Sequence, residues 1–185
     1  MSDRAVLRVL LVLVTAILLL FLANVTLFIR VNTLQSEVLE ALKPFQRNMG
    51  LPVAAKAPEF ELANTNGEKI TLSGYLGHRI LIAFTSTTCG ACEEIYPEIR
   101  RFSESESDTI VLMISKGSME ENRQMRAEQG FRFPVLTWTD EVSAAYQVPG
   151  TPFFYVVNSE GAVGQAGFAG SLEQLREMVH AVETK

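Results

Sequence analysis

The chain has two cysteines, Cys89 and Cys92, which stand three residues apart. They lie in the stretch TSTTCGACEEIYPEI, where an apolar run gives way to a helix-like pattern. The unpaired N–H groups and positive dipole end of a helix N-terminus stabilise a thiolate, so a cysteine there has a lowered pKa. We therefore predict that Cys89 is a nucleophile. Cys92, one turn into the helix, is then sheltered and placed to attack a mixed disulfide formed at Cys89.

A metal site and a structural disulfide are the two alternatives for this cysteine pair. A zinc site needs two further soft or imidazole ligands, and the only histidines, His78 and His180, are far apart in the sequence. No metal is therefore expected, and each histidine is interpreted as solvated. A disulfide across two residues closes a very short loop and removes little unfolded-state entropy. A redox role is favoured over both alternatives.

A second candidate feature is the stretch VPGTPFFYVV, in which Pro152 opens a strand directly after Thr151. A proline at the start of a strand donates no ladder hydrogen bond, and in a tight turn its peptide bond can be cis. The neighbouring backbone is then free to pair with an incoming extended peptide. Thr151 and Pro152 are thus candidates for a client-binding groove, and an ordinary strand-edge proline is the alternative.

The elements that would position these residues alternate between strand-like and helix-like patterns. They are a hairpin around Asn66-Gly67, a strand at 79–86, a helix at 90–103, a strand at 109–115, a helix at 118–130, a strand at 133–138, two strands at 151–157 and 162–170, and a closing helix from the Ser171 cap to about residue 182. Such alternation predicts an α/β fold with a sheet covered on both faces, its last two strands pairing as a hairpin.

An uncharged run from Val9 to Ile29 precedes this domain. At about 1.5 Å of rise per residue a helix of this length spans roughly 31 Å, which is the thickness of the hydrocarbon core of a bilayer. A cleaved leader is the alternative, but it would end in a small-x-small site, and Phe21 stands two residues before Ala23. The segment is therefore predicted to be a retained transmembrane helix.

The charges on the two sides of this helix are nearly balanced, so they do not decide its orientation. A persistent dithiol-disulfide couple needs an oxidising compartment or a dedicated reductant, which places the domain outside the cytoplasm. We predict a cytoplasmic tip and anchor at 1–30, a helical stalk and linker at 31–56, and a redox domain at 57–185.

Apolar residues at alternating steps of three and four predict either a plain stalk or a weak homodimer contact. They are Val31, Leu34, Val38, Ala41 and Phe45.

The part of the chain beyond residue 30 is acidic, with 13 basic and 20 acidic residues and a net charge of −7. Such a domain is a poor candidate for binding nucleic acid or anionic lipid surfaces, because both carry negative charge. Its partners are expected to be proteins or small molecules.

Residues 57–92, Pro97 and residues 146–163 together resemble the membrane-anchored thioredoxin-like redoxins of the TlpA/MauD family. The resemblance implies a thioredoxin fold, with a central mixed sheet flanked by helices, an N-terminal β-hairpin extension and a preceding transmembrane helix. It also implies a redox disulfide between Cys89 and Cys92, a cis peptide bond before Pro152, and no cofactor besides that disulfide.

The resemblance further implies a single-pass protein of the inner, cytoplasmic membrane that exchanges disulfides with a protein client in the periplasm. A membrane or periplasmic partner would then exchange electrons with it. Membership of a methylamine-oxidation pathway would imply maturation of a periplasmic enzyme such as methylamine dehydrogenase.

The sequence departs from this family at three positions near the cysteines. Thr88 stands where many relatives carry Trp, Ala83 where thioredoxin keeps a buried acid, and Ile95 where some cytochrome-maturation relatives carry Glu. The usual proton acceptor for the second cysteine is therefore missing, unless Glu93 or Glu94 replaces it. A solvated first helical turn is the alternative interpretation of these glutamates. The uncharged Gly-Ala pair between the cysteines does not indicate whether the protein oxidises or reduces.

Two other functions fit a fold of this kind. A peroxiredoxin-like peroxidase has a Pro-x-x-x-Thr-x-x-Cys loop, and here Ile82 and Ser86 occupy the proline and threonine positions before Cys89. Ser86 keeps the hydroxyl of the threonine position, whereas Ile82 replaces the proline. A non-enzymatic assembly factor would use the same fold to hold a partner at the membrane, with its cysteines structural or relaying a metal.

Overall fold

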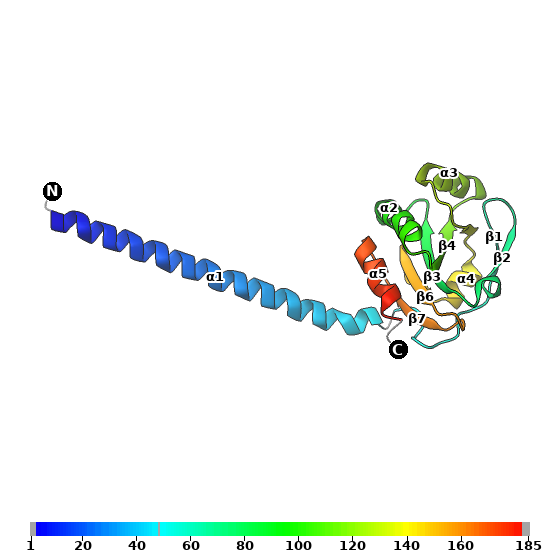
Figure 1. Cartoon of the computed structure of the whole chain (residues 1–185), viewed down its shortest axis with the longest axis horizontal. Coiled ribbons are helices and arrows are strands. Elements are labelled where there is room, and N and C mark those ends of the chain that lie inside the picture. The colour runs from blue at the N-terminus through cyan, green and yellow to red at the C-terminus, as the bar shows by residue number, and fades with distance from the viewer. Residues whose placement is uncertain (1–2, 48, 183–185) are drawn as a thin grey trace. The chain divides into compact units, whose positions relative to one another are not determined.

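The computed structural model describes residues 3–47 and 49–182, with side chains at 11, 13–35 and 49–182. The chain divides into two units, Met1–Phe45 and Gln46–Lys185. Residues 3–45 of the first unit form one helix, and the second unit is an α/β domain (Figure 1).

Helix α1 runs from Asp3 to Arg47. Its segment Leu13–Gln35 has a mean hydropathy of 2.2 over 23 residues and is long and apolar enough to cross a membrane. Three of its polar side chains, those of Asn24, Thr26 and Thr33, donate to carbonyls of the preceding helical turn, as Thr26 does to the Leu22 carbonyl at 2.7 Å. This arrangement suits an apolar surrounding, where an unpaired polar group is costly.

The stalk seam predicted after the apolar segment lies only partly within the described residues. The side chains of Val31 and Leu34 are exposed on the helix surface. Those of Val38, Ala41 and Phe45 lie outside the described side chains. The homodimer contact stays a prediction.

A five-stranded mixed sheet forms the centre of the domain, in the order β5-β4-β3-β6-β7 (Figure 1). Strand β3 is parallel to β4 and antiparallel to β6, and β6 is antiparallel to β7. The strands are β3 (Arg79–Ser86), β4 (Thr109–Lys116), β5 (Val135–Thr137), β6 (Phe153–Val157) and β7 (Val163–Gly167). The predicted mixed sheet and its final hairpin are confirmed.

Helices and a hairpin cover the two faces of this sheet (Figure 1). Helices α2 and α5 pack on one face with part of α3, and the β1–β2 hairpin and α4 pack on the other. The elements are β1 (Glu61–Ala63), β2 (Lys69–Thr71), a 3₁₀ turn (Ser73–Tyr75), α2 (Gly90–Ser105), α3 (Met119–Gln129), α4 (Asp140–Ala145) and α5 (Leu172–His180). The predicted hairpin and three of these helices are confirmed, and α4 was not predicted.

The core is built on β3, which lies at the centre of the sheet. Leu81 and Ala83 point into the core beneath α2, whereas Ile82 and Phe84 point into the core beneath the hairpin, and all four are fully buried. Side chains alternate along a strand, so an unbroken apolar run suits a strand that is covered on both faces. This strand ends at the loop that carries the cysteines.

The segment predicted as the end of a linker pairs with the domain. The Ala54 N–H donates to the Val163 carbonyl at 2.7 Å, and the Val163 N–H donates to the Ala55 carbonyl at 2.8 Å. The Ala57 N–H donates to the Gly161 carbonyl at 2.9 Å. The segment is therefore attached beside the start of β7, through an isolated antiparallel bridge between Lys56 and Ala162.

Candidate active site

Cys89 is the N-cap residue of α2 and follows β3 after a loop of two residues. Its backbone is extended, with φ −102° and ψ 110°, and its sulfur accepts a hydrogen bond from the Cys92 N–H at 3.3 Å. The sulfur thus occupies the place where a capping oxygen normally satisfies a free amide at a helix start. Cys89 is half-buried and Cys92 is fully buried, and both are free thiols.

The two thiols differ in acidity. Burial raises the pKa of Cys89, but hydrogen bonds from the side chains of Cys92 and Thr151 and from the backbone amides of Cys92 and Ala91 outweigh it, so its pKa lies below the ordinary value. Burial, together with the hydrogen bond to Cys89, raises the pKa of Cys92 to about 12. Cys89 is therefore the more acidic of the two thiols and the one that forms a thiolate more readily.

The start of β6 faces the cysteine loop across the site. The Cys89 thiol donates to the Thr151 carbonyl at 3.4 Å, although the two residues are 62 positions apart in the sequence. The Thr151–Pro152 peptide bond is cis, as the resemblance implied. Pro152 is buried, and Thr151 is half-buried beside the sulfur.

The loop between β3 and Cys89 is held mainly by Ser86. Its hydroxyl accepts the Thr88 N–H at 3.3 Å, and its carbonyl accepts the Cys89 N–H at 3.2 Å. The same carbonyl accepts the Tyr96 hydroxyl at 3.1 Å. Tyr96 was missed from the sequence, although its position four residues after Cys92 puts both on one face of the helix.

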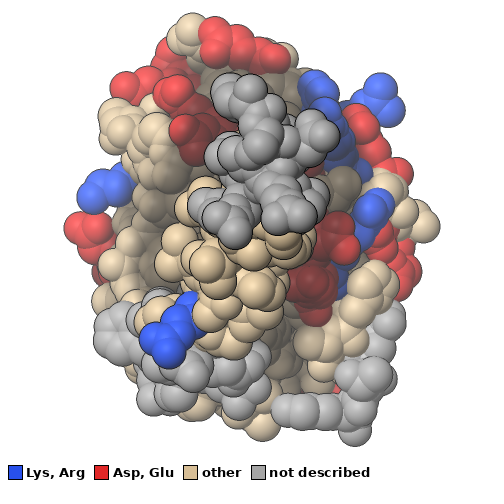
Figure 2. Space-filling model, turned by 90° about the vertical axis from the view of Figure 1, so that its left-hand side faces the viewer, with Lys and Arg blue, Asp and Glu red and all other residues tan. Residues whose placement is uncertain are grey.

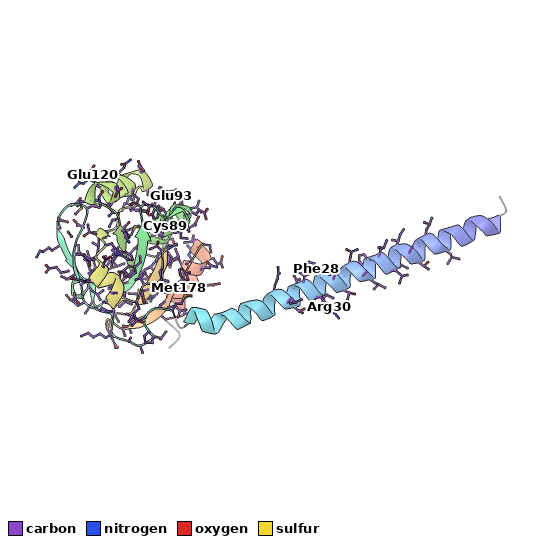
Figure 3. The ribbon with its side chains drawn as sticks, turned by 180° about the vertical axis from the view of Figure 1, so that it is seen from behind. Phe28, Arg30, Cys89, Glu93, Glu120 and Met178 are labelled. Atoms are coloured by element: carbon purple, nitrogen blue, oxygen red, sulfur yellow. The ribbon has the colours of Figure 1, made fainter. Side chains whose placement is uncertain are left out.

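The two glutamates that follow Cys92 point outward from α2. Glu93 and Glu94 are exposed, and within the described residues no hydrogen bond joins either carboxylate to Cys92. Figure 3 shows Glu93 next to Cys89 at the start of α2, with Glu120 on α3 beyond it. Their role as proton acceptors stays a prediction.

A pocket of about 420 Å³ opens beside the cysteine loop, between α2 and α3. Its walls are Thr87, Thr88, Glu93, Tyr96, Glu121, Gln124, Met125, Glu128 and Gln129. The two helices together carry seven glutamates and four arginines, and Figure 2 shows acidic side chains at the top of the view with basic ones to their right. The pocket wall itself includes Glu93, Glu121 and Glu128 and no basic residue, so the lining of the pocket beside the cysteine loop is acidic.

The structure puts no carboxylate behind the buried cysteine from the two positions where relatives carry one. Ala83 and Ile95 are both buried in the core that contains Cys92. His78 and His180 are exposed, at the start of β3 and the end of α5. Among the described residues, no group of three or more histidine, cysteine or acidic side chains could hold a metal ion.

Comparison with known proteins places the chain in a family. Residues 53–166, which are more than half of the chain, match the AhpC/TSA family. The chain belongs to this family. Fold likeness agrees, since a thioredoxin-family thiol:disulfide interchange protein from Chlorobium tepidum superposes with a TM-score of 0.64 at 18% identity, covering 70% of this chain and 97% of that protein. The predicted thioredoxin fold is confirmed.

Proteins with similar sequences indicate the functional class within this family. The methylamine utilization protein MauD of Paracoccus versutus is 27% identical over 135 residues, which are 73% of this chain and 68% of MauD. The thiol-disulfide oxidoreductase ResA of Bacillus subtilis is 30% identical over 112 residues, which are 58% of this chain and 62% of ResA. These relatives confirm the predicted class, a thioredoxin-like thiol-disulfide oxidoreductase of the TlpA/MauD type.

Proposed function

We propose that this protein exchanges disulfides with a protein client through Cys89 and Cys92, anchored to the inner membrane with its redox domain in the periplasm. One observation carries the proposal. The Cys89 sulfur lies half-exposed at the start of α2 and accepts the Cys92 N–H at 3.3 Å, with Cys92 buried behind it. This arrangement gives one reactive thiol and one protected thiol within a single helical turn.

In the reducing direction, the Cys89 thiolate attacks one sulfur of a client disulfide. The client S–S bond breaks, and its other sulfur leaves as a thiolate that takes a proton from water. Cys92 then gives up its proton and attacks the Cys89 sulfur. This step breaks the mixed disulfide, releases the second client thiolate and leaves a Cys89–Cys92 disulfide, so two electrons have passed to the client. In the oxidising direction, the same steps run backwards.

Thr151 and Pro152 form the client groove in this proposal. The Thr151 carbonyl lies 3.4 Å from the Cys89 sulfur, so a client backbone lying along this edge would bring its own sulfur to the thiolate. Glu93 or Glu94 accepts the Cys92 proton, through water, since both carboxylates are exposed. A membrane or periplasmic dithiol-disulfide partner returns the pair to its starting state, and no further cofactor is required.

The client is proposed to be a disulfide-rich periplasmic enzyme, such as methylamine dehydrogenase, that needs this exchange to mature. The support is similarity to proteins that are named for methylamine utilization.

The proposed periplasmic orientation of the redox domain is tested by adding protease to spheroplasts. Digestion of the domain is expected, and full protection would place it in the cytoplasm.

The exchange itself is tested by trapping the client. The Cys92→Ser variant lacks the resolving thiol and is expected to stay bound to its client through Cys89, which gives reductant-sensitive bands of higher mass on a non-reducing gel of membranes. The Cys89→Ser variant is the matched control and is expected to trap nothing. Equal trapping by both variants, or by neither, would contradict the assigned roles. Mass spectrometry of the bands identifies the client.

The peroxidase alternative finds little support at the loop. Ile82, at the proline position, is fully buried in the middle of β3, and the Ser86 hydroxyl is engaged with Thr88. Consumption of hydrogen peroxide by the reduced protein would favour a peroxidase. Retained biological function in a variant with both cysteines replaced by serine would favour the assembly factor instead.

A further inference from the structure

Tyr96 joins the reactive loop to the helix that carries both cysteines. It is 2% exposed and lies one helical turn beyond Cys92 on α2. Its hydroxyl donates to the Ser86 carbonyl at 3.1 Å, and that carbonyl also accepts the Cys89 N–H at 3.2 Å. One oxygen atom at the end of β3 is therefore shared by the helix side chain and by the reactive cysteine.

The other bonds of this loop reach β4, Thr151, the loop itself or only the first turn of α2, where the Cys89 carbonyl accepts the N–H groups of Cys92 and Glu93 at 3.0 and 3.2 Å. The Thr87 N–H donates to the Lys116 carbonyl at 2.9 Å, which ties the loop to β4. The Thr88 N–H donates to the Ser86 hydroxyl at 3.3 Å, which is a contact within the loop. Among the described side chains, the Tyr96 hydroxyl is the one that bonds this loop to α2 beyond the first turn of the helix.

The environment of Tyr96 keeps its hydroxyl in place as a donor. Its ring packs edge-on against Phe131, with centroids 5.7 Å apart, in the core beneath α2. Burial raises the pKa of the phenol to about 12, and the nearby Cys92 and Cys89 add to this effect. The hydroxyl therefore keeps its proton at neutral pH and can donate throughout the range in which Cys89 titrates.

We propose that Tyr96 is a positioning residue of the exchange site, whose hydroxyl holds the Ser86 carbonyl so that the Cys89 sulfur stays against the Cys92 N–H. This inference rests on the proposed function of the cysteine pair. Without the hydroxyl, the loop from Ser86 to Cys89 keeps its own contacts, its bond to β4 and the bonds of Cys89 to Thr151 and to the first turn of α2, but Ser86 loses its bond to the body of the helix. The contact between the Cys89 sulfur and the helix amide is then made for less of the time, and the thiolate loses stabilisation.

The opposite face of the sheet offers a matched control. Tyr146 is fully buried, and its hydroxyl donates to the Pro58 carbonyl at 2.8 Å. Tyr146→Phe therefore deletes the same kind of buried hydrogen bond as Tyr96→Phe, from a tyrosine that packs in the other core cluster. A general loss of stability affects both variants, whereas loosening of the cysteine loop affects Tyr96→Phe alone.

The test measures how fast iodoacetamide alkylates Cys89 as a function of pH. The reduced full-length chain is used in detergent micelles. The peptide of residues 80–100 contains both cysteines, so fragment ions in its mass spectrum assign the label to Cys89 or to Cys92. In Tyr96→Phe, the midpoint of the profile is expected to rise by at least about half a pH unit, which corresponds to roughly threefold slower alkylation below the midpoint. The Tyr146→Phe profile is expected to coincide with that of the unmodified protein.

Each other outcome has a distinct meaning. The positioning role is overturned if the Tyr96→Phe profile coincides with the unmodified one, or if both variants shift equally. It is also overturned if circular dichroism shows that Tyr96→Phe alone unfolds, because the hydroxyl then serves the fold and not the site. If Cys89 of the unmodified protein reacts only at the pH of an ordinary thiol, the proposed function fails, whatever the variants do.

Discussion

The two faces of the central sheet both bury tyrosine hydroxyls, but they use them differently. Beneath α2, the Tyr96 hydroxyl bonds to Ser86 at the base of the cysteine loop. On the other face, the Tyr146 hydroxyl bonds to Pro58, and the Tyr155 hydroxyl donates to the Tyr146 carbonyl. The first arrangement holds the loop of the two thiols, whereas the second attaches residues 51–58, called here the N-terminal segment of the domain, to the sheet.

The two faces also differ in the kinds of side chain that pack on them. The face away from the cysteines contains a cluster of rings, in which Phe84 lies 5.3 Å from Tyr146, 5.6 Å from Trp138 and 6.0 Å from Tyr155 between centroids. The face beneath α2 contains Cys92 among aliphatic and aromatic side chains. The sheet separates the two clusters. Substitutions beneath α2 should therefore change the reactivity of the cysteines, whereas substitutions on the other face should change only the free energy of unfolding.

The largest effect is expected from Cys89→Ser, which removes the nucleophile on the reactive face. Reduction of a model protein disulfide should fall to the uncatalysed rate, because the serine hydroxyl has no accessible anion near neutral pH. The thermal midpoint should stay close to that of the reduced unmodified protein, since oxygen replaces sulfur at a half-buried site. Residual exchange in this variant would mean that Cys92 can act alone.

The complementary change is Phe84→Ala on the opposite face. Phe84 is fully buried in the ring cluster, so its removal should lower the free energy of unfolding by about 3–5 kcal/mol. Urea unfolding followed by circular dichroism measures this loss. Under conditions where the variant is folded, Cys89 should be alkylated at the unmodified rate, and a slower rate would show that the two faces are coupled through β3.

Stability should also depend on pH through Cys92. Its folded-state pKa of about 12 lies above the ordinary thiol value, so the folded protein favours the protonated form. This contribution is complete below the ordinary pKa and is lost as the pH rises above it, because the unfolded chain then releases the proton first. The urea midpoint of the reduced protein should therefore fall between about pH 8.5 and pH 10.

The matched comparison for this pH effect is Cys92→Ala, in which the fall over that interval should be shallower. The buried hydroxyls of Tyr96, Tyr146 and Tyr155 also have raised pKa values because of burial, so both proteins should lose stability at still higher pH. Parallel curves for the two proteins over the whole range would mean that Cys92 is not held protonated by its burial.

The sequence predicted most of the fold because the main elements carry strong local signals. Strand β3 lies at 79–86, α3 lies between its caps Ser118 and Gly130, and Ser171 caps α5, as the patterns at 79–86, 118–130 and 171–182 predicted. Helix α4 was missed because it has only six residues and no buried stripe, and its start depends on the Thr139 cap. Short helices of this kind are set by tertiary contacts more than by periodicity.

The site was predicted less completely than the fold. Cysteine spacing indicated the reactive pair, and the resemblance indicated the cis bond before Pro152. The contact between Tyr96 and Ser86 depends on where β3 ends relative to α2, which no local pattern encodes. The pairing of Ala54 and Ala55 with Val163 of β7 could not be predicted either, because these are backbone hydrogen bonds, which do not require a particular side chain.

The smallest effect is expected from Tyr155→Phe. The Tyr155 hydroxyl accepts the Leu51 N–H at 2.9 Å and donates to the Tyr146 carbonyl, so it links the N-terminal segment to β6. Removing it keeps the ring in its cluster and should lower the free energy of unfolding by about 1–2 kcal/mol. The Leu51 amide should exchange hydrogen faster, while the alkylation profile of Cys89 should not change. A shifted profile would mean that the N-terminal attachment reaches the cysteine loop through β6 and Thr151, and the division of labour between the faces would then fail.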